Sequence, residues 1–350
     1  MLRRRFRGRR GAGEQYLRGL VMMPFRPSRR AVLAAPLLAA SLGGGSAAAA
    51  ENDFGEFLAG VRRDALAHGI RPATIEAALR SIQYLPHVIE LDQRQPEHTM
   101  TFAEFIAKFV TPERKEDVRR ALVENWPLLD RVYRAYGVEP RFVVALWGIE
   151  SNFGKNAGTY LVPSSLATLA YQGRRGPMFR GELIAALRIL DEGDIHADMM
   201  VGSWAGAMGQ CQFMPSTFLN YAVDFDRDGR RDIWGDRADV AGSIANYISR
   251  LGWRGNEGWG QQAWVPQNFD TKLTGLETRR PLGDWARLGV RMTRGRTPTG
   301  PEIEASLLLP DGPGGQALLV YDNFRTIMRW NKSTYFAATV GYLADSVERS

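Results

Sequence analysis

A glutamate at the end of an apolar segment is the first candidate for chemistry. Glu150 follows the nearly all-apolar residues 142–149, and the turn-forming residues Ser151, Asn152 and Gly154 come directly after it. A carboxyl group placed where a buried helix opens into a polar loop loses part of its hydration, which raises its pKa. Such a group stays protonated near neutral pH and can act as a general acid. The alternative is a cap-region or ion-paired glutamate with no catalytic role.

A second candidate site is the segment 202–216, which is rich in glycine and alanine. Small residues allow the backbone to approach a ligand closely. Ser203 lies in this segment, and Trp204, Gln212 and Phe213 supply stacking faces and amide hydrogen bonds, the combination that sugar-binding grooves use. The alternative is a tight helix contact that leads into a helix starting at Pro215.

A third candidate is an acidic loop at residues 224–236, which matches most of an EF-hand calcium loop. Acids stand at loop positions 1, 3, 5 and 9, and glycine stands at position 6, but position 12 is Gly235 and the next acid comes one residue late. A structural Ca²⁺ would require the loop to bulge. The alternative is a D-x-D-x-D-G surface turn. The predicted metal-binding residues are Asp224, Asp226, Asp228, Arg230 and Asp236.

The elements that must position these residues are mostly helices. Apolar residues recur at three- and four-residue steps in five segments and again near the end of the chain, which predicts amphipathic or buried helices. A glycine- and proline-rich turn at residues 310–315 separates two apolar runs that read as strands, 305–309 and 317–321. The sequence therefore predicts a mainly α (α+β) protein with a small β-containing insertion. The helical segments are 54–79 with a break at 69–72, 102–110, 112–122, 127–136, 140–149 and 335–347.

The charge of the chain is concentrated at its amino terminus. The 350 residues carry a net charge of +7, but residues 1–50 contain ten arginines and a single acid, Glu14. The remainder is therefore slightly acidic, at about −2. A nucleic-acid-binding surface would need basic residues in the folded part. We therefore expect no nucleic-acid partner.

Residues 1–50 have the features of a cleaved signal peptide. Arg29 and Arg30 precede an apolar run, 31–42, and the small residues Ala48 and Ala50 match the A-x-A cleavage preference. The paired arginines indicate the twin-arginine route, and an ordinary Sec signal is the alternative. The run is too short and too rich in alanine to span a bilayer. The only cysteine, Cys211, lies far from the cleavage site, so neither a lipid anchor nor an internal disulfide is expected.

Taken in order along the chain, these segments resemble the lytic murein transglycosylase B family of lysozyme-like periplasmic enzymes. The similarity covers most of residues 52–348. It is carried by the stretches 95–97 (QPE), 109–112 (FVTP), 136–138 (YGV), 147–150 (WGIE), 202–216, 221–225 (YAVDF), 245–247 (ANY) and 330–333 (WNKS).

The resemblance implies an architecture and a set of site residues. It implies a lysozyme-like helical catalytic region at 51–260, a small β-containing subdomain at 261–322 and a C-terminal segment at 323–350 that packs back on the helical body. Glu150 aligns with the family's catalytic acid, and Trp330 stands where relatives carry tyrosine. The residues expected to line the sugar groove are Ser203, Gln212, Phe213, Tyr247, Trp330 and Asn331.

The implied reaction is cleavage of the β-1,4 bond between N-acetylmuramic acid and N-acetylglucosamine without water. Glu150 would protonate the leaving oxygen and then take a proton from the C6 hydroxyl of the muramic acid, which closes a 1,6-anhydro ring. No cofactor is required for this chemistry. The expected partner is the peptidoglycan glycan strand, and the chain is expected to be a periplasmic monomer without a stable membrane anchor.

Two alternatives to this reaction stay open. A hydrolytic muramidase would need an ordered water and a second carboxylate in the cleft. A non-catalytic peptidoglycan-binding protein would need neither. The acids considered for the hydrolytic role are Asp191, Glu192, Asp194 and Asp198.

Overall fold

The computed structural model describes residues 44–94, 100–255, 257–293 and 303–347, with side chains from Asp53 onward. The expected signal peptide lies outside these ranges up to residue 43, as does the stretch 95–97. Helix α1 (Gly44–Ala67) begins ahead of the expected cleavage site after Ala50. Among the described residues, no helix is both long and apolar enough to cross a membrane.

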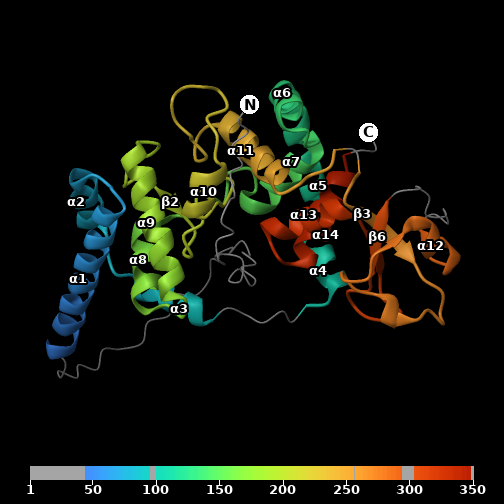
Figure 1. Ribbon diagram of the computed structural model, residues 1–350, viewed down its shortest axis with the longest axis horizontal. Helices are drawn as coiled ribbons and strands as arrows, with labels where there is room; N and C mark the ends of the chain where they lie inside the picture. Colours follow the sequence, from blue (N-terminus) through green and yellow to red (C-terminus); the bar gives the residue numbers. More distant parts are fainter. Residues whose placement is uncertain (1–43, 95–99, 256, 294–302, 348–350) are drawn as a thin grey trace, which may run out of the picture.

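Helices make up most of the described chain (Figure 1). Helices α8 and α9 form a pair, and α1 and α2, from the start of the described chain, lie against α9. The bounds of the helices after α1 are α2 Pro72–Ser81, α3 Pro86–Gln93, α4 Phe102–Phe109, α5 Pro112–Glu124, α6 Trp126–Tyr136, α7 Pro140–Ser151, α8 Val162–Gln172, α9 Gly176–Glu192, α10 Pro215–Tyr221, α11 Arg237–Arg250, α12 Leu282–Arg287, α13 Asp322–Trp330 and α14 Thr334–Asp345.

Helix α7 lies at the centre of the helical body. Its residues 142–148 are all buried, as its apolar composition predicts. Helices α5, α6, α11 and α14 pack around it. Because α14 comes from the end of the chain, this contact closes the helical body around the helix that carries Glu150.

A five-stranded antiparallel sheet follows the helical body along the chain, in the order β4-β6-β7-β3-β5. It lies beside α13 and α14 on one side and carries α12 on the other (Figure 1). The two runs expected as strands form the central hairpin, β6 with β7. The bounds are β3 Gly260–Trp264, β4 Arg280–Pro281, β5 Arg291–Met292, β6 Glu304–Leu308 and β7 Ala317–Val320; a separate short pair joins β1 Tyr160–Leu161 to β2 Val201–Gly202.

The two faces of β7 belong to two hydrophobic cores. Leu318 and Val320 pack into the core of the helical body, whereas Leu319 packs into a second core with Trp285 of α12. Side chains alternate along a strand, so a strand that is buried throughout must serve a core on each side. The sheet therefore joins the helical body and the β-containing segment through shared strands.

Most of the predicted helices are present, and their bounds differ by a few residues. The break at 69–72 separates α1 from α2, and the segments starting near Phe102, Pro112, Pro127 and Pro140 correspond to α4 to α7. Helices α3, α8, α9, α11, α12 and α13 were not predicted. The fold class, mainly helical with a small antiparallel sheet, is confirmed.

Candidate active site

Glu150 is held at the last turn of α7 by a sharp change in chain direction. Asn152 adopts a left-handed conformation (φ 50°) and its N–H donates to the carbonyl of Gly148. The Ser151 hydroxyl accepts a hydrogen bond from the N–H of Gly154 at 3.0 Å. Helices commonly end on a left-handed residue in this way. The turn fixes the carboxyl at the boundary between the buried helix and the loop.

The carboxyl group of Glu150 has one hydrogen-bond donor at close range. Trp330 Nε1, at the end of α13, donates to Glu150 Oε1 at 2.7 Å. Burial raises the pKa of Glu150 to about 8, and the hydrogen bond from Trp330 opposes this increase without cancelling it. The prediction of a desolvated, protonated carboxyl from the sequence is therefore supported by its surroundings.

Aromatic side chains surround this hydrogen bond. The rings of Phe213, Tyr247 and Trp330 lie 4.9 to 5.4 Å apart, centroid to centroid, and Tyr221 stacks on Tyr247 at 4.3 Å. Burial, with added repulsion from Tyr221 and Glu150, raises the pKa of Tyr247 to about 12, so its hydroxyl stays neutral. The structure thus brings four predicted residues together from α7, α11, α13 and the segment 202–216.

The segment 202–216 folds into a tight double turn rather than an open loop. Met208 bridges to both Gly202 and Phe213. A Cβ atom on Gly202 would come within 2.1 Å of the Ala207 carbonyl oxygen, and one on Gly209 within 2.6 Å of the Ile233 carbonyl oxygen. These glycines therefore let the backbone of this segment approach neighbouring backbone closely.

The polar side chains predicted for the sugar groove already form hydrogen bonds with backbone groups. The Ser203 hydroxyl accepts from the Ala207 N–H at 3.1 Å, and Gln212 Nε2 donates to the carbonyls of Ala157 and Gly209 at 2.9 and 2.8 Å. Asn331 Oδ1 accepts from the Ser333 N–H at 3.1 Å. The turn also requires a left-handed backbone at Gln212 (φ 51°), which is uncommon for a non-glycine residue. Backbone strain of this kind often marks functional segments.

The acids considered for a hydrolytic mechanism are mostly paired with cations. Asp191 accepts hydrogen bonds from Arg71 and Thr74, and Arg231 forms ion pairs with Glu192 and Asp194. Asp198 is exposed. Within the described ranges, none of these four acids hydrogen-bonds to Glu150.

Three carboxylates converge at the acidic loop, and one of them was not predicted. Oxygen atoms of Asp224, Asp226 and Asp239 lie within 4.8 Å of one another. Asp239 is buried in the first turn of α11 and accepts from the N–H groups of Phe225 and Asp232. Burial raises its pKa to about 6, two backbone hydrogen bonds oppose the increase, and the charges of Asp236 and Asp226 add to it.

The other acids predicted to bind the metal accept hydrogen bonds from nearby backbone N–H groups. Asp236 caps α11 by accepting from the N–H groups of Ala238 and Asp239, and Asp228 accepts from the N–H of Arg230. The last acid of the cluster is therefore Asp239, three residues beyond the expected Asp236. An oxygen-rich cluster of mutually repelling carboxylates suits a calcium ion.

Cys211 is a packing residue. It is fully buried and its Sγ lies 3.6 Å from the carbonyl oxygen of Val240. Burial raises the pKa of the Cys211 thiol well above its usual range. The residue therefore lacks the reactivity of a nucleophile, in agreement with the sequence.

Comparisons with known proteins agree with this arrangement. Residues 53–345 match the transglycosylase SLT domain family. The chain is 33% identical over 304 residues to the membrane-bound lytic murein transglycosylase B of Escherichia coli (strain K12), which covers 80% of this chain and 79% of the relative.

Solved structures of relatives superpose on most of the chain. SltB3 from Pseudomonas aeruginosa in complex with NAG-NAM-pentapeptide matches with a TM-score of 0.82 and 43% identity, over 85% of this chain and 80% of that chain. The Escherichia coli lytic transglycosylase Slt35 in complex with calcium matches with a TM-score of 0.70 and 29% identity, over 85% and 92% of the two chains. The chain is a member of the lytic murein transglycosylase B family, whose catalytic region is lysozyme-like.

Proposed function

We propose that this enzyme cleaves the β-1,4 bond between N-acetylmuramic acid and N-acetylglucosamine in peptidoglycan and forms 1,6-anhydromuramic acid ends, with Glu150 as the catalytic residue. Membership in the family supports a lytic transglycosylase acting on peptidoglycan. The observation that carries the assignment to Glu150 is the position of its carboxyl, half-buried at the last turn of α7 with Trp330 Nε1 at 2.7 Å. Desolvation at this position raises the pKa to about 8, so the group stays protonated at neutral pH.

The hydrogen bond from Trp330 determines which oxygen can deliver the proton. An indole N–H can only donate, so Oε1 must accept and the acidic proton resides on Oε2. Glu150 then donates this proton to the glycosidic oxygen as the bond to the muramic acid C1 breaks. As a carboxylate it next accepts the proton of the C6 hydroxyl, whose oxygen attacks C1. The proton from the C6 hydroxyl replaces the one that Glu150 gave to the glycosidic oxygen. Glu150 therefore returns to its protonated state, and the proton count balances.

A second carboxylate is not needed for this sequence. The attacking hydroxyl belongs to the substrate, and intramolecular reactions of well-oriented groups reach effective molarities of about 10⁵–10⁸ M. Three of the four acids considered for a hydrolytic mechanism are engaged with arginines or a threonine. This arrangement favours the transglycosylase over the muramidase.

Mass analysis of products from purified peptidoglycan tests the proposal. We expect 1,6-anhydromuramic acid ends, lighter by one water than the reducing ends that a hydrolase makes. Glu150→Gln keeps the size of the side chain and should lower the rate by at least about 10²–10⁴-fold, because it removes the general acid. Reducing ends would contradict the reaction, and full activity of Glu150→Gln would contradict the site.

A calcium ion, where bound, would have a structural role in this chain. The carboxylates of Asp224, Asp226 and Asp239 are the groups that would hold it, and they tie the loop to the first turn of α11. Helix α11 also carries Tyr247. Calcium would therefore stabilise the support of the aromatic cluster without taking part in proton transfer.

Export to the periplasm is part of the proposal. It is supported by the arginine pair, the apolar run and the A-x-A sequence of residues 29–50. Amino-terminal sequencing of the periplasmic form should begin near Glu51, and a sequence that starts before Ser46 would contradict this expectation.

A further inference from the structure

The side chain of Gln210 joins helix α7 to the acidic loop. Its amide lies between Trp147 of α7 and Trp234 near the end of the loop. Trp147 Nε1 donates to Gln210 Oε1 at 2.9 Å, and Gln210 Nε2 donates to the carbonyl of Trp234 at 2.8 Å. The backbone N–H of Gln210 also donates to the carbonyl of Ile233 at 2.8 Å. Gln210 is therefore hydrogen-bonded to two separate parts of the fold.

An amide is the side-chain group that this position requires. The indole N–H of Trp147 can only donate a hydrogen bond, and the carbonyl of Trp234 can only accept one. The group between them must accept on one side and donate on the other. A carboxylate or an ammonium group could do only one of these, whereas the amide of Gln210 does both.

Trp147 connects Gln210 to the turn that holds Glu150. Residues three apart on a helix are neighbours on its surface, so Trp147 and Glu150 share one face of α7. The carbonyl of Trp147 accepts from the Ser151 hydroxyl at 3.4 Å and from the N–H of Phe153 at 3.5 Å. Its indole, which is 2% exposed, meets the ring of Phe153 edge-on at 5.4 Å. A shift of Trp147 would therefore move the last turn of α7.

The amide of Gln210 also contacts the loop after Glu150 directly. A Cβ atom on Gly154 would lie 2.6 Å from Gln210 Oε1, so the backbone of Gly154 packs against the amide. Asn152, Phe153 and Gly154 have left-handed backbones, with φ of 50°, 58° and 83°. Such conformations are uncommon for non-glycine residues and persist only where the surrounding structure holds them. The amide of Gln210 is part of that structure.

The acidic loop gives Gln210 a fixed point of attachment. Asp232 Oδ1 accepts from the N–H of Trp234 at 2.9 Å, and the N–H of Asp232 donates to Asp239 of α11 at 2.7 Å. Trp234 Nε1 donates to the carbonyl of Val201 in β2 at 2.9 Å. The carbonyl that accepts from Gln210 therefore belongs to a residue that is itself bonded to α11, through Asp232, and to β2.

We propose that Gln210 is a positioning residue, which keeps the Glu150 carboxyl against Trp330 and directed at the glycosidic oxygen. The inference rests on the proposed function, because it acts through Glu150. Gln210 exerts this effect through Trp147 and the turn at 152–154. Both ends of its amide bind protein groups, so removing the amide should slow the reaction without weakening the binding of the glycan.

The kinetic test replaces Gln210 with a side chain of similar size. Gln210→Met removes both hydrogen bonds of the amide. It should lower kcat at least about tenfold, since a misplacement of about 1 Å can cost about 10²-fold in rate. KM for glycan strands should stay within about twofold of the wild-type value, because the lost contacts are made within the protein and not to bound substrate.

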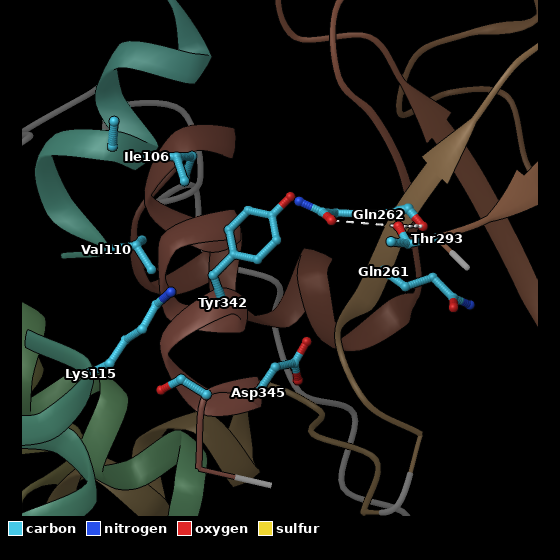
Figure 2. A pocket seen from close by; sticks show the side chains of 10 residues that line it. Ile106, Val110, Lys115, Gln261, Gln262, Thr293, Tyr342 and Asp345 are labelled. Atoms are coloured by element: carbon cyan, nitrogen blue, oxygen red, sulfur yellow. Dashed lines mark hydrogen bonds between the residues drawn. The ribbon is translucent and has the colours of Figure 1, made fainter. Parts of the chain in front are cut away.

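Gln262 of β3 provides the matched control. Figure 2 shows its side chain near Thr293 and Tyr342, in a cavity of about 570 Å³ between the helical body and the sheet. Its amide accepts from the Thr293 hydroxyl at 3.5 Å and hydrogen-bonds to the Tyr342 hydroxyl. Gln262→Met therefore removes one accepted and one donated hydrogen bond from a half-buried residue, in a cavity that α7 does not line. Its kcat should equal that of the wild type.

Indole N–H signals report the positions of the tryptophans without any need for cleavage. Labelling the nine tryptophans with ¹⁵N gives one indole signal for each, and single Trp→Phe variants assign them. Gln210→Met should move the signal of Trp147, which loses its acceptor, and that of Trp330, which donates to Glu150. The signal of Trp285, which belongs to the second core, should not move.

A double-variant cycle tests whether Gln210 and Trp147 act through their shared hydrogen bond. Trp147→Phe removes the donor and should lower kcat as Gln210→Met does. The double variant should be close in kcat to the slower single variant, because the second change removes a bond that is already lost. Losses that multiplied would show independent effects and would contradict the proposal. Trp147→Phe also tests the same bond if Gln210→Met does not fold.

Unchanged kcat or an unmoved Trp330 signal in a folded Gln210→Met variant would overturn the proposal. An equal loss of kcat in Gln262→Met would do so as well, because it would reflect a general loosening of the fold. If the wild-type chain forms anhydro ends and the Trp330 signal does not move, the positioning role alone is rejected. If the wild-type chain forms no anhydro ends, the proposed function is rejected, and the Trp330 signal still shows whether Gln210 positions Glu150.

Discussion

The acid strength of Glu150 results from two opposing effects on one carboxyl group. Burial favours the neutral form, whereas the Trp330 N–H favours the carboxylate, and burial prevails. The sequence indicates the first effect through the apolar residues before Glu150. It does not indicate the second, because Trp330 is 180 residues away and only the fold brings its indole to 2.7 Å.

Removing the indole donor should shift the pH dependence of activity. The proposed mechanism needs protonated Glu150, so we expect activity below its pKa of about 8 and a fall above it. Trp330→Phe removes a donor that lowers this pKa, so the pKa should rise and the basic limb of kcat/KM should move to higher pH. The maximal rate should fall as well, because the proton is no longer confined to one oxygen.

A matched variant distinguishes this effect from the effect of removing an indole N–H elsewhere in the chain. Trp253 Nε1 donates to Glu139 at 2.7 Å, a different acid, so Trp253→Phe should leave the basic limb where it is. Measuring kcat/KM from pH 5 to 10 for both variants tests the prediction. A shift of the Trp330→Phe limb to lower pH would contradict the stated role of the hydrogen bond.

At the scale of the elements, local sequence signals predict where several helices start but do not reveal every helix. The side chains of Thr101 and Thr111 cap the first turns of α4 and α5, where the sequence predicts helices from residues 102 and 112. Helix α8 gave no amphipathic signal because residues 162–169 are all buried, including two serines and a threonine. The hydroxyls of Ser164 and Thr168 accept from the N–H groups of Gln83 and Leu85, partners that the sequence pattern cannot reveal.

The contact between α14 and the start of the sheet leaves no space at Gly341. A Cβ atom there would lie 2.2 Å from the indole of Trp259, which is 1% exposed. Gly341→Ala should therefore destabilise the chain by about 1–3 kcal/mol, the usual cost of overpacking. Gly181→Ala in α9, where an added Cβ meets no described atom within 4 Å, should instead stabilise it by about 0.5–1 kcal/mol. Urea denaturation would measure the free energy of unfolding of both variants. Equal changes in this free energy would contradict the explanation from packing.

The acidic loop and α11 should be stabilised together by calcium. A ligand at 100 times its dissociation constant adds about 2.7 kcal/mol, so melting curves with calcium and with chelator should separate. Asp239→Asn should abolish this separation because the buried Asp239 carboxylate belongs to the cluster. Asp236→Asn should preserve it, since asparagine caps a helix as well as aspartate does. If Asp236→Asn abolished the separation of the melting curves and Asp239→Asn preserved it, Asp236 would be the metal ligand instead.

At the scale of the whole molecule, the described chain has two hydrophobic cores that meet at one sheet. The prediction of a β-containing subdomain places its start at residue 261, next to the start of β3 at Gly260. It does not reveal that residues of β6 and β7 alternate between the two cores. Alternation of burial is visible in a sequence only when one face is polar, and residues 317–320 are apolar at every position.

Shared strands should make the described chain unfold as a single unit. Leu318 packs into the core of the helical body and Leu319 into the second core, and both are fully buried neighbours on β7. Truncating either leucine to alanine should cost about 2–5 kcal/mol. One strand cannot leave its sheet without exposing both cores. Each variant should therefore lower the midpoint of the same unfolding transition. Circular dichroism, which reports the helices, and tryptophan fluorescence should then give coincident curves. If Leu319→Ala lowered only an early transition while the helices melted unchanged, the β-containing segment would be an independent unit, and the catalytic helices would not depend on it for their stability.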